Sequence, residues 1–180
     1  MIYKTKPLKH QQDAVERFRD QDYGALFCEM GTGKTKIVLD ILRNSTDLFE
    51  AVVIAPNGLH HNWAINEIPK HVSSSDLDPV EVYCWKGPIK TKKSKQEFAR
   101  FLKPESSRIF LINVEALRTS SGFETTIKFL KTCVGLKHMI IDESTCIKIP
   151  KLCRQNVCLI WLVWLHVGGY STAHQLPRVH

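Results

Sequence analysis

The chain has 180 residues, of which 43% are hydrophobic and 24% charged, and its formal net charge is +7. This length suits one domain with a substantial core, and the composition is that of a soluble globular protein, which excludes the disordered and fibrous classes. The longest apolar run, residues 158–167, is about half of the roughly 20 residues that a membrane-spanning helix needs. The amino-terminal residues lack the apolar stretch of a signal peptide, and the six cysteines include no C-x-x-C pair. We therefore expect a cytoplasmic protein with an acidic partner, nucleic acid first, and no membrane partner.

Short β-branched runs alternate with helical patterns along the whole chain. We expect helices at 8–19, 34–43, 59–70, 96–102 and 124–133, and strands at 23–28, 50–56, 80–85, 108–113 and 138–142. This alternation predicts an α/β fold with a parallel sheet covered by helices on both faces. Ligands of such sheets bind beyond the carboxyl ends of the strands, so the segments after the first, second, fourth and fifth strands are expected to share one functional edge.

The turn after the first strand, CEMGTGKTK at residues 28–36, has the features of a phosphate-binding loop. It reads G-x-G-K-T, although the first glycine of the full pattern G-x-x-x-x-G-K-[ST] is Cys28 here. In this interpretation Lys34 reaches the outer phosphates of a nucleotide and Thr35 ligates Mg²⁺. The remaining cradle is the backbone of Met30, Gly31, Thr32 and Gly33. The alternative, an ordinary glycine turn before a helix, accounts less well for the strand–turn–helix context.

The predicted fifth strand ends in two adjacent carboxylates, in the sequence MIIDEST at residues 139–145. Asp142 can hold Mg²⁺ and complete the cation site that Thr35 begins, while Glu143 can orient and deprotonate an attacking water. A helix-capping pair without function is the alternative. The position of the Asp-Glu pair at a strand end, downstream of a phosphate loop, favours a catalytic site in which Glu143 and Lys34 are the catalytic residues.

A basic segment runs from residue 86 to residue 103, with seven basic residues against one glutamate. No aromatic residues alternate with its lysines, so a nucleic acid would be contacted through its phosphates. Lys90, Lys92 and Lys93 are the first candidates for this contact. A solvated loop and helix face is an equally compatible interpretation.

The ordered motifs EMGTGKT, IAPNGLHHNWAINEI and IIDEST resemble those of the first RecA-like lobe of the superfamily-two helicase-like ATPases. The resemblance is strongest to the Swi/Snf branch, especially its compact phage and bacterial members, and covers residues 8–151. KPLKHQQDAV resembles the upstream glutamine motif, with Gln11 as the adenine-reading residue, and LINVEALRT at 111–119 resembles motif Ib, which contacts the nucleic-acid backbone. The residues that match motif Ia are Pro56, Leu59, Asn62, Trp63 and Glu67.

The resemblance implies a P-loop NTPase (RecA-like) fold that binds ATP and Mg²⁺ and couples ATP hydrolysis to movement on nucleic acid. DNA is favoured over RNA, and the location would be a bacterial or phage-infected host cytoplasm. It also suggests Pro56, Asn57 and Asn113 as nucleic-acid contacts. The chain departs from the family at Ser144-Thr145, which follow the Asp-Glu pair, and we interpret His60 and His61 as ordinary surface or core histidines.

The character of the sequence changes after residue 151. Residues 152–180 contain no Asp, Glu or Lys and no Thr-Gly-Thr-Pro-like motif III. We therefore divide the chain into an ATP-binding lobe, 1–151, and an atypical tail, 152–180, which a frameshifted or truncated gene would explain. The second RecA-like lobe of the family, with its arginine finger, is missing from these residues. The motif III strand would lie between the phosphate-loop strand and the Asp-Glu strand, and the segment CLIWLVW has the apolar content to occupy that slot. A zinc site made of Cys146, Cys153, Cys158 and His166 has no standard ligand spacing.

Three functions remain open from the sequence. The first is the nucleotide-binding lobe of an ATP-driven nucleic-acid motor. The second is a small P-loop kinase or nucleotidase, which would need an arginine-rich lid and a substrate pocket. The third is a non-catalytic fragment that only binds nucleotide or DNA.

Overall fold

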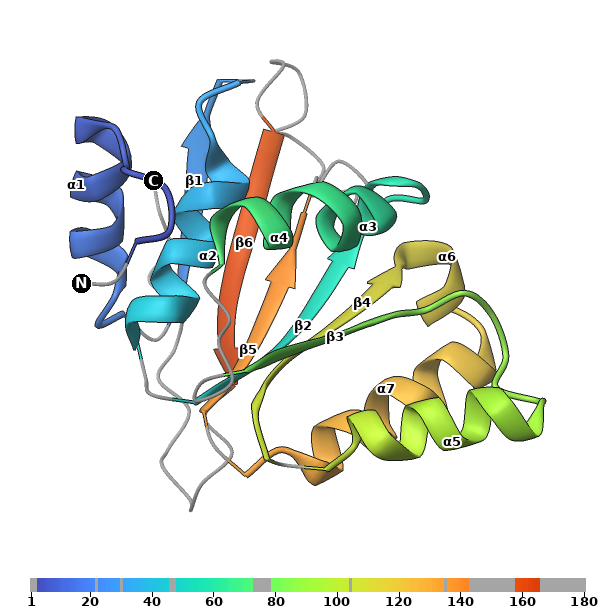
Figure 1. The fold of residues 1–180 in the computed structure, drawn as a ribbon. Coiled ribbons are helices and arrows are strands. Elements are labelled where there is room, and N and C mark those ends of the chain that lie inside the picture. The colour runs from blue at the N-terminus through green and yellow to red at the C-terminus, as the bar shows by residue number, and fades with distance from the viewer. Residues whose placement is uncertain are drawn as a thin grey trace, which may run out of the picture.

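The computed structural model describes residues 3–21, 23–29, 31–45, 48–72, 79–103, 105–134, 136–142 and 158–165. Within these residues one sheet of six strands has the order β1-β6-β5-β2-β4-β3 (Figure 1). The strands are β1 (Tyr23–Cys28), β2 (Phe49–Ala55), β3 (Val80–Cys84), β4 (Ser107–Asn113), β5 (Leu136–Ile141) and β6 (Cys158–Leu165). Strands β3, β4, β2 and β5 are mutually parallel neighbours, which confirms the predicted α/β fold with a parallel sheet.

Helices cover both faces of this sheet (Figure 1). One face carries α1 (Lys9–Phe18), α2 (Lys34–Ser45) and the helical run 59–71, while the other carries α5 (Lys92–Phe101) and α7 (Ser120–Thr132). Alternate residues of β2 supply the two cores, Ala51 and Val53 to the first and Val52 and Ile54 to the second. Because side chains alternate across a strand, a strand buried on both faces must be apolar throughout its interior.

The register of β2 aligns the carboxyl ends of three strands. Ala55 pairs with Asn113 of β4, and Ile54 pairs with Ile141 of β5. The backbone N–H of Asp142 continues the ladder by donating to the carbonyl of Ile54 at 2.8 Å. The loops that leave β2, β4 and β5 therefore begin at the same edge, as the alternation of elements predicted.

The helix predicted at 59–70 is one continuous helical run whose middle turn is π-helical instead of α-helical. It consists of α3 (Leu59–Asn62), a π-helical turn η1 (Trp63–Glu67) and α4 (Ile68–His71). Pro69 explains the change, because it has no N–H to donate four residues back and its ring crowds the carbonyl there. Two further differences are the short helix α6 (Val114–Leu117) and the earlier start of α5 and α7.

Strand β6 lies in the slot between the phosphate-loop strand β1 and strand β5. It runs antiparallel to both neighbours, with Cys158 opposite Cys28 and Leu165 opposite Lys137. The apolar content of CLIWLVW indicated that it could fill this slot, but periodicity cannot give a strand's direction. Separately, no helix in the described part of the chain is long and apolar enough to span a membrane.

A buried ion pair joins β2 to β4 beneath the second core. Glu50 and Arg108 are register neighbours, are 4% and 0% exposed, and are hydrogen-bonded to each other. The guanidinium also donates to the carbonyls of Leu102, at 2.8 Å, and Thr132, at 3.0 Å, and stacks over the ring of Phe129. Arg108 thus ties the end of α5 and the end of α7 to the sheet.

We expect Arg108→Met to lower the free energy of unfolding by about 3–5 kcal/mol, because it removes the cation that compensates the charge of the buried Glu50 carboxylate. The double variant Arg108→Met/Glu50→Met should recover most of that loss. The control is Lys9→Met, which breaks the exposed Lys9–Asp13 pair. This variant should change the free energy of unfolding by less than about 1 kcal/mol. Urea unfolding of the four proteins measures this, and a double variant no more stable than the single one would contradict the pairing argument.

His138 of β5 should make the fold sensitive to acid. It is 2% exposed, and burial lowers its pKa to about 4. The unfolded pKa is near 6.5, so the neutral ring favours the folded state fully above that pH, and this stability is lost as the pH falls toward 4. When the pH is lowered from 7 to 5, the free energy of unfolding of wild type, measured with urea, should fall by roughly 2 kcal/mol more than that of His138→Leu. Parallel pH profiles for the two proteins would show that this ring does not titrate with unfolding.

Candidate functional site

The glycine loop connects the end of β1 at Cys28 to the start of α2 at Lys34. Gly31 and Gly33 have φ values of 80° and 79°, in the left-handed region that glycine adopts without strain. A Cβ on Gly33 would lie 2.4 Å from Nε2 of Gln11, so a larger residue there would also displace the Gln11 amide. The Thr32 hydroxyl donates to the carbonyl of Glu29 at 2.9 Å and closes the loop on itself.

Lys34 is the buried cation of this loop. Its side chain is folded back over the turn, where Nζ donates to the carbonyls of Glu29 at 2.7 Å and Cys28 at 3.1 Å. Only 8% of the residue is exposed. The loop therefore holds a fixed positive charge at the start of a helix, the arrangement that attracts phosphate.

Helix α1 supports the loop through Gln11. The amide nitrogen of Gln11 donates to the Thr32 carbonyl at 3.1 Å, and its Oε1 accepts from the backbone N–H of Leu8 at 3.0 Å. The ring of His10 lies 3.1 Å from the same Thr32 carbonyl. Gln11 is 6% exposed, so its amide is part of the wall behind the loop.

Asp142 follows β5 and is positioned by the helical run on the same face of the sheet. The indole N–H of Trp63 donates to Oδ2 of Asp142 at 2.7 Å, with both residues buried. A buried tryptophan N–H needs an acceptor, and here the acceptor is the carboxylate itself. The hydrogen bond joins the first residue of the π-helical turn to the end of the central sheet.

These groups line one cavity of about 470 Å³. Thr35 and Asp142 both face it, and a hydroxyl and a carboxylate are the hard oxygen ligands that Mg²⁺ prefers, so the residues present fit that ion. A larger hollow of about 770 Å³ lies between β3 and α5, but no glycine loop borders it. We therefore place the candidate site at the smaller cavity. Its described walls are Gln11, Gly31, Gly33, Lys34, Thr35, Lys36, Leu59, Asn62, Trp63, Glu67, Lys70, His71 and Asp142.

Several wall residues were not predicted as site residues from the sequence. Lys70 and His71, on the polar face of the helical run, belong to this group. Helical spacing was the available signal, because residues three and four apart from Leu59 onward share one face of a helix. Trp63 was matched to motif Ia, but its contact with Asp142 depends on tertiary packing.

The other predicted residues are more dispersed. Met30 and Glu143 lie outside the described residues. Pro56 and Asn57 follow β2 at the functional edge, and Asn113 accepts the N–H of Ala116 at 2.6 Å, so its side chain caps α6. The basic cluster, defined as Lys90, Lys92 and Lys93, is exposed before and at the start of α5, beyond edge strand β3. Five strand spacings separate β3 from β1, roughly 24 Å, so this cluster is not part of the phosphate cavity.

Comparison with known protein families matches the SNF2-related domain over residues 10–162. The matched range includes Gln11, the glycine loop, the helical run with Trp63, and Asp142. No curated protein and no solved structure matches the chain. The chain therefore belongs to the family of SNF2-related domains, as a first lobe of the Swi/Snf type of superfamily-two helicase-like ATPases with the P-loop NTPase fold.

Proposed function

We propose that this chain is the ATP-binding lobe of a DNA-dependent translocase that couples ATP hydrolysis to movement on nucleic acid. The observation that supports this best is the convergence of the glycine loop, Lys34, Thr35 and Asp142 on one cavity. The family uses nucleotide and Mg²⁺ in general. The proposal that this chain itself binds ATP and Mg²⁺ rests on those side chains.

Each residue has a defined task in this proposal. Lys34 exchanges its two loop carbonyls for the outer phosphates of ATP, while the loop backbone, Met30 included, cradles them. Thr35 and Asp142 hold Mg²⁺, whose charge offsets that of the phosphates. The Trp63 indole holds one oxygen of Asp142 and so orients the carboxylate toward the cavity. Gln11 contributes the adenine-reading amide.

Hydrolysis needs two further contributions. Glu143, next to Asp142 in the sequence, is the proposed base that deprotonates the attacking water. Charge on the transferred phosphoryl group is met by an arginine finger, which contributes roughly 10³–10⁵ in rate. In this family the finger comes from a second RecA-like lobe, so we propose that residues 1–151 form the first lobe and turn over ATP only slowly without a second one.

A small P-loop kinase that acts on a metabolite is the alternative function, and the reaction products distinguish it from a motor. Such an enzyme would transfer phosphate to a small acceptor, whereas the proposed motor would release inorganic phosphate faster when nucleic acid is present. The arginines of this chain are scattered along it and do not form a lid sequence, which favours the motor.

We expect Lys34→Ala to weaken binding of ATP–Mg²⁺ at least tenfold, about 1.4 kcal/mol, because the loop loses its buried ammonium. Isothermal titration calorimetry on the folded variant measures this. Lys131→Ala, which removes an exposed lysine from α7 on the other face, is the matched control and should bind as wild type does. Equal affinity of Lys34→Ala and wild type would remove the basis for the phosphate site.

The basic cluster should contact nucleic-acid phosphates without sequence preference. Changing Lys90, Lys92 and Lys93 to Gln should reduce the slope of log K against log salt by up to about 2.7, which is 0.9 for each phosphate contact. Fluorescence anisotropy with duplex DNA at several salt concentrations gives the slope. The matched triple variant, Lys6, Lys128 and Lys131 to Gln, makes the same charge change at exposed positions outside the basic segment. If both triple variants lower the slope equally, the cluster is only a solvated face.

A further inference from the structure

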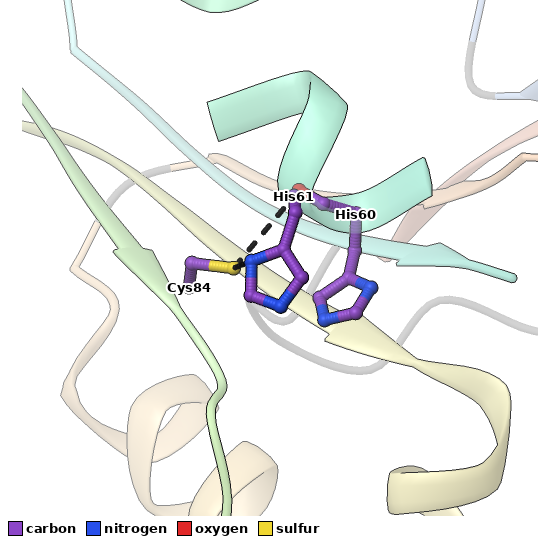
Figure 2. Close-up of side chains that lie close together, drawn as sticks. All are labelled: His60, His61 and Cys84. Atoms are coloured by element: carbon purple, nitrogen blue, oxygen red, sulfur yellow. Dashed lines mark hydrogen bonds between the residues drawn. The ribbon is translucent and has the colours of Figure 1, made fainter. Parts of the chain in front are cut away.

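Two histidines and a cysteine meet near edge strand β3, on the same face of the sheet as α2. His60 and His61 belong to α3, and Cys84 is the last residue of edge strand β3. Figure 2 shows the two rings side by side with the sulfur of Cys84 next to the ring of His61. Sγ of Cys84 lies 3.2 Å from Nδ1 of His61, and one ligand atom from each of the three residues lies within 4.8 Å of the others.

The convergence of the two rings is not a consequence of helical geometry. Consecutive residues of a helix normally point in different directions, yet the ring centroids of His60 and His61 are only 4.2 Å apart. His60 is 1% exposed, and its Nδ1 has no hydrogen-bond partner. A buried polar nitrogen without a partner costs free energy, which a ligand at that atom would recover.

The chemistry of these atoms selects a class of ligand. Two imidazoles and a thiol are the donors that soft and borderline transition metals prefer, whereas Mg²⁺ and Ca²⁺ require oxygen ligands. Burial is the main cause that lowers the pKa of His60, followed by the neighbouring His61, and a neutral imidazole is the form that binds metal.

We propose that His60, His61 and Cys84 form a zinc-binding site that fastens α3 to the edge strand β3. The three side chains provide two nitrogens and one thiolate sulfur, and the fourth position is left for water or an exogenous ligand, as in other three-ligand zinc sites. Binding Zn²⁺ releases the thiol proton of Cys84 to solvent and replaces the Cys84–His61 contact by two bonds to the metal. Tetrahedral coordination needs ligand atoms about 3.4–3.6 Å apart, so the widest-spaced pair, at up to 4.8 Å, must close by about 1.4 Å at most.

A cysteine–histidine nucleophile is the competing use of this pair. Such a nucleophile requires a thiol with a lowered pKa. Burial instead raises the pKa of Cys84, with only a smaller opposing effect from Lys86. Zn²⁺ must displace this thiol proton, because metal binding is coupled to deprotonation of its ligands.

The test uses the full chain, reduced, freed of metal with a chelator and without an affinity tag. Co²⁺, the spectroscopic substitute for Zn²⁺, should give tetrahedral visible bands and a sulfur-to-cobalt charge-transfer band that saturate at one equivalent. Zn²⁺ should displace the cobalt, and excess Mg²⁺ should not. Cys84→Ser should lose the charge-transfer band, and His61→Gln should weaken Co²⁺ binding at least about tenfold.

Two control variants separate this site from other thiols. Cys28 is also a half-buried residue at a strand end, so Cys28→Ser should leave the cobalt spectrum unchanged. Cys153→Ser tests whether this cysteine of the tail is a metal ligand, and it should also leave the cobalt spectrum unchanged. Circular dichroism verifies that each variant folds, and His61→Gln alone decides the question if Cys84→Ser does not fold. Absence of a charge-transfer band in wild type, or its retention in Cys84→Ser, would overturn the proposal, as would its loss in Cys28→Ser or Cys153→Ser.

Discussion

The parallel pairing of β2 on both of its edges is the constraint on which the structure depends. Strand β2 is hydrogen-bonded to β4 and β5 and covered by helices on both faces, and all seven of its residues are buried. Parallel connections must return each chain segment to the starting edge, so each of the parallel strands β2, β3, β4 and β5 delivers its following loop to the same side. The cavity exists at that edge because three strands end there in register, and the polar residues follow the last buried position of each strand.

Two side chains then turn this edge into an organised site. Gln11 fixes the glycine loop from α1, and Trp63 fixes Asp142 from the helical run, so both the phosphate side and the cation side are positioned by buried groups of neighbouring helices. The π-helical turn begins at Trp63, and π-helical turns occur frequently at functional sites. A site held in this way is largely formed before its ligand arrives, and less of the binding free energy is spent on ordering side chains.

Sequence patterns predicted the elements and the loop chemistry because both depend on local spacing. The strand at 23–28 and the start of α2 at Lys34 were located to the residue, since a glycine turn separates a period-2 run from a 3.6-period one. The patterns could not give the π-helical turn or the contact of Trp63 with Asp142, which require knowledge of what packs on the helix. His60 and His61 were interpreted as ordinary histidines for the same reason: Cys84 is distant in sequence and reaches them only through the placement of β3 in the sheet.

The direction of β6 determines which of its two ends lies next to the glycine loop. Its first residue, Cys158, lies beside Cys28 at the threshold of the glycine loop, while its last, Leu165, lies beside the start of β5, roughly 25 Å away along the strand. A parallel strand in this slot would place its last residue, not its first, beside the end of β1. Because β6 is reversed, a displacement at the end of β1 reaches the first residue of β6 directly, while its last residue is separated from the glycine loop by the length of the strand.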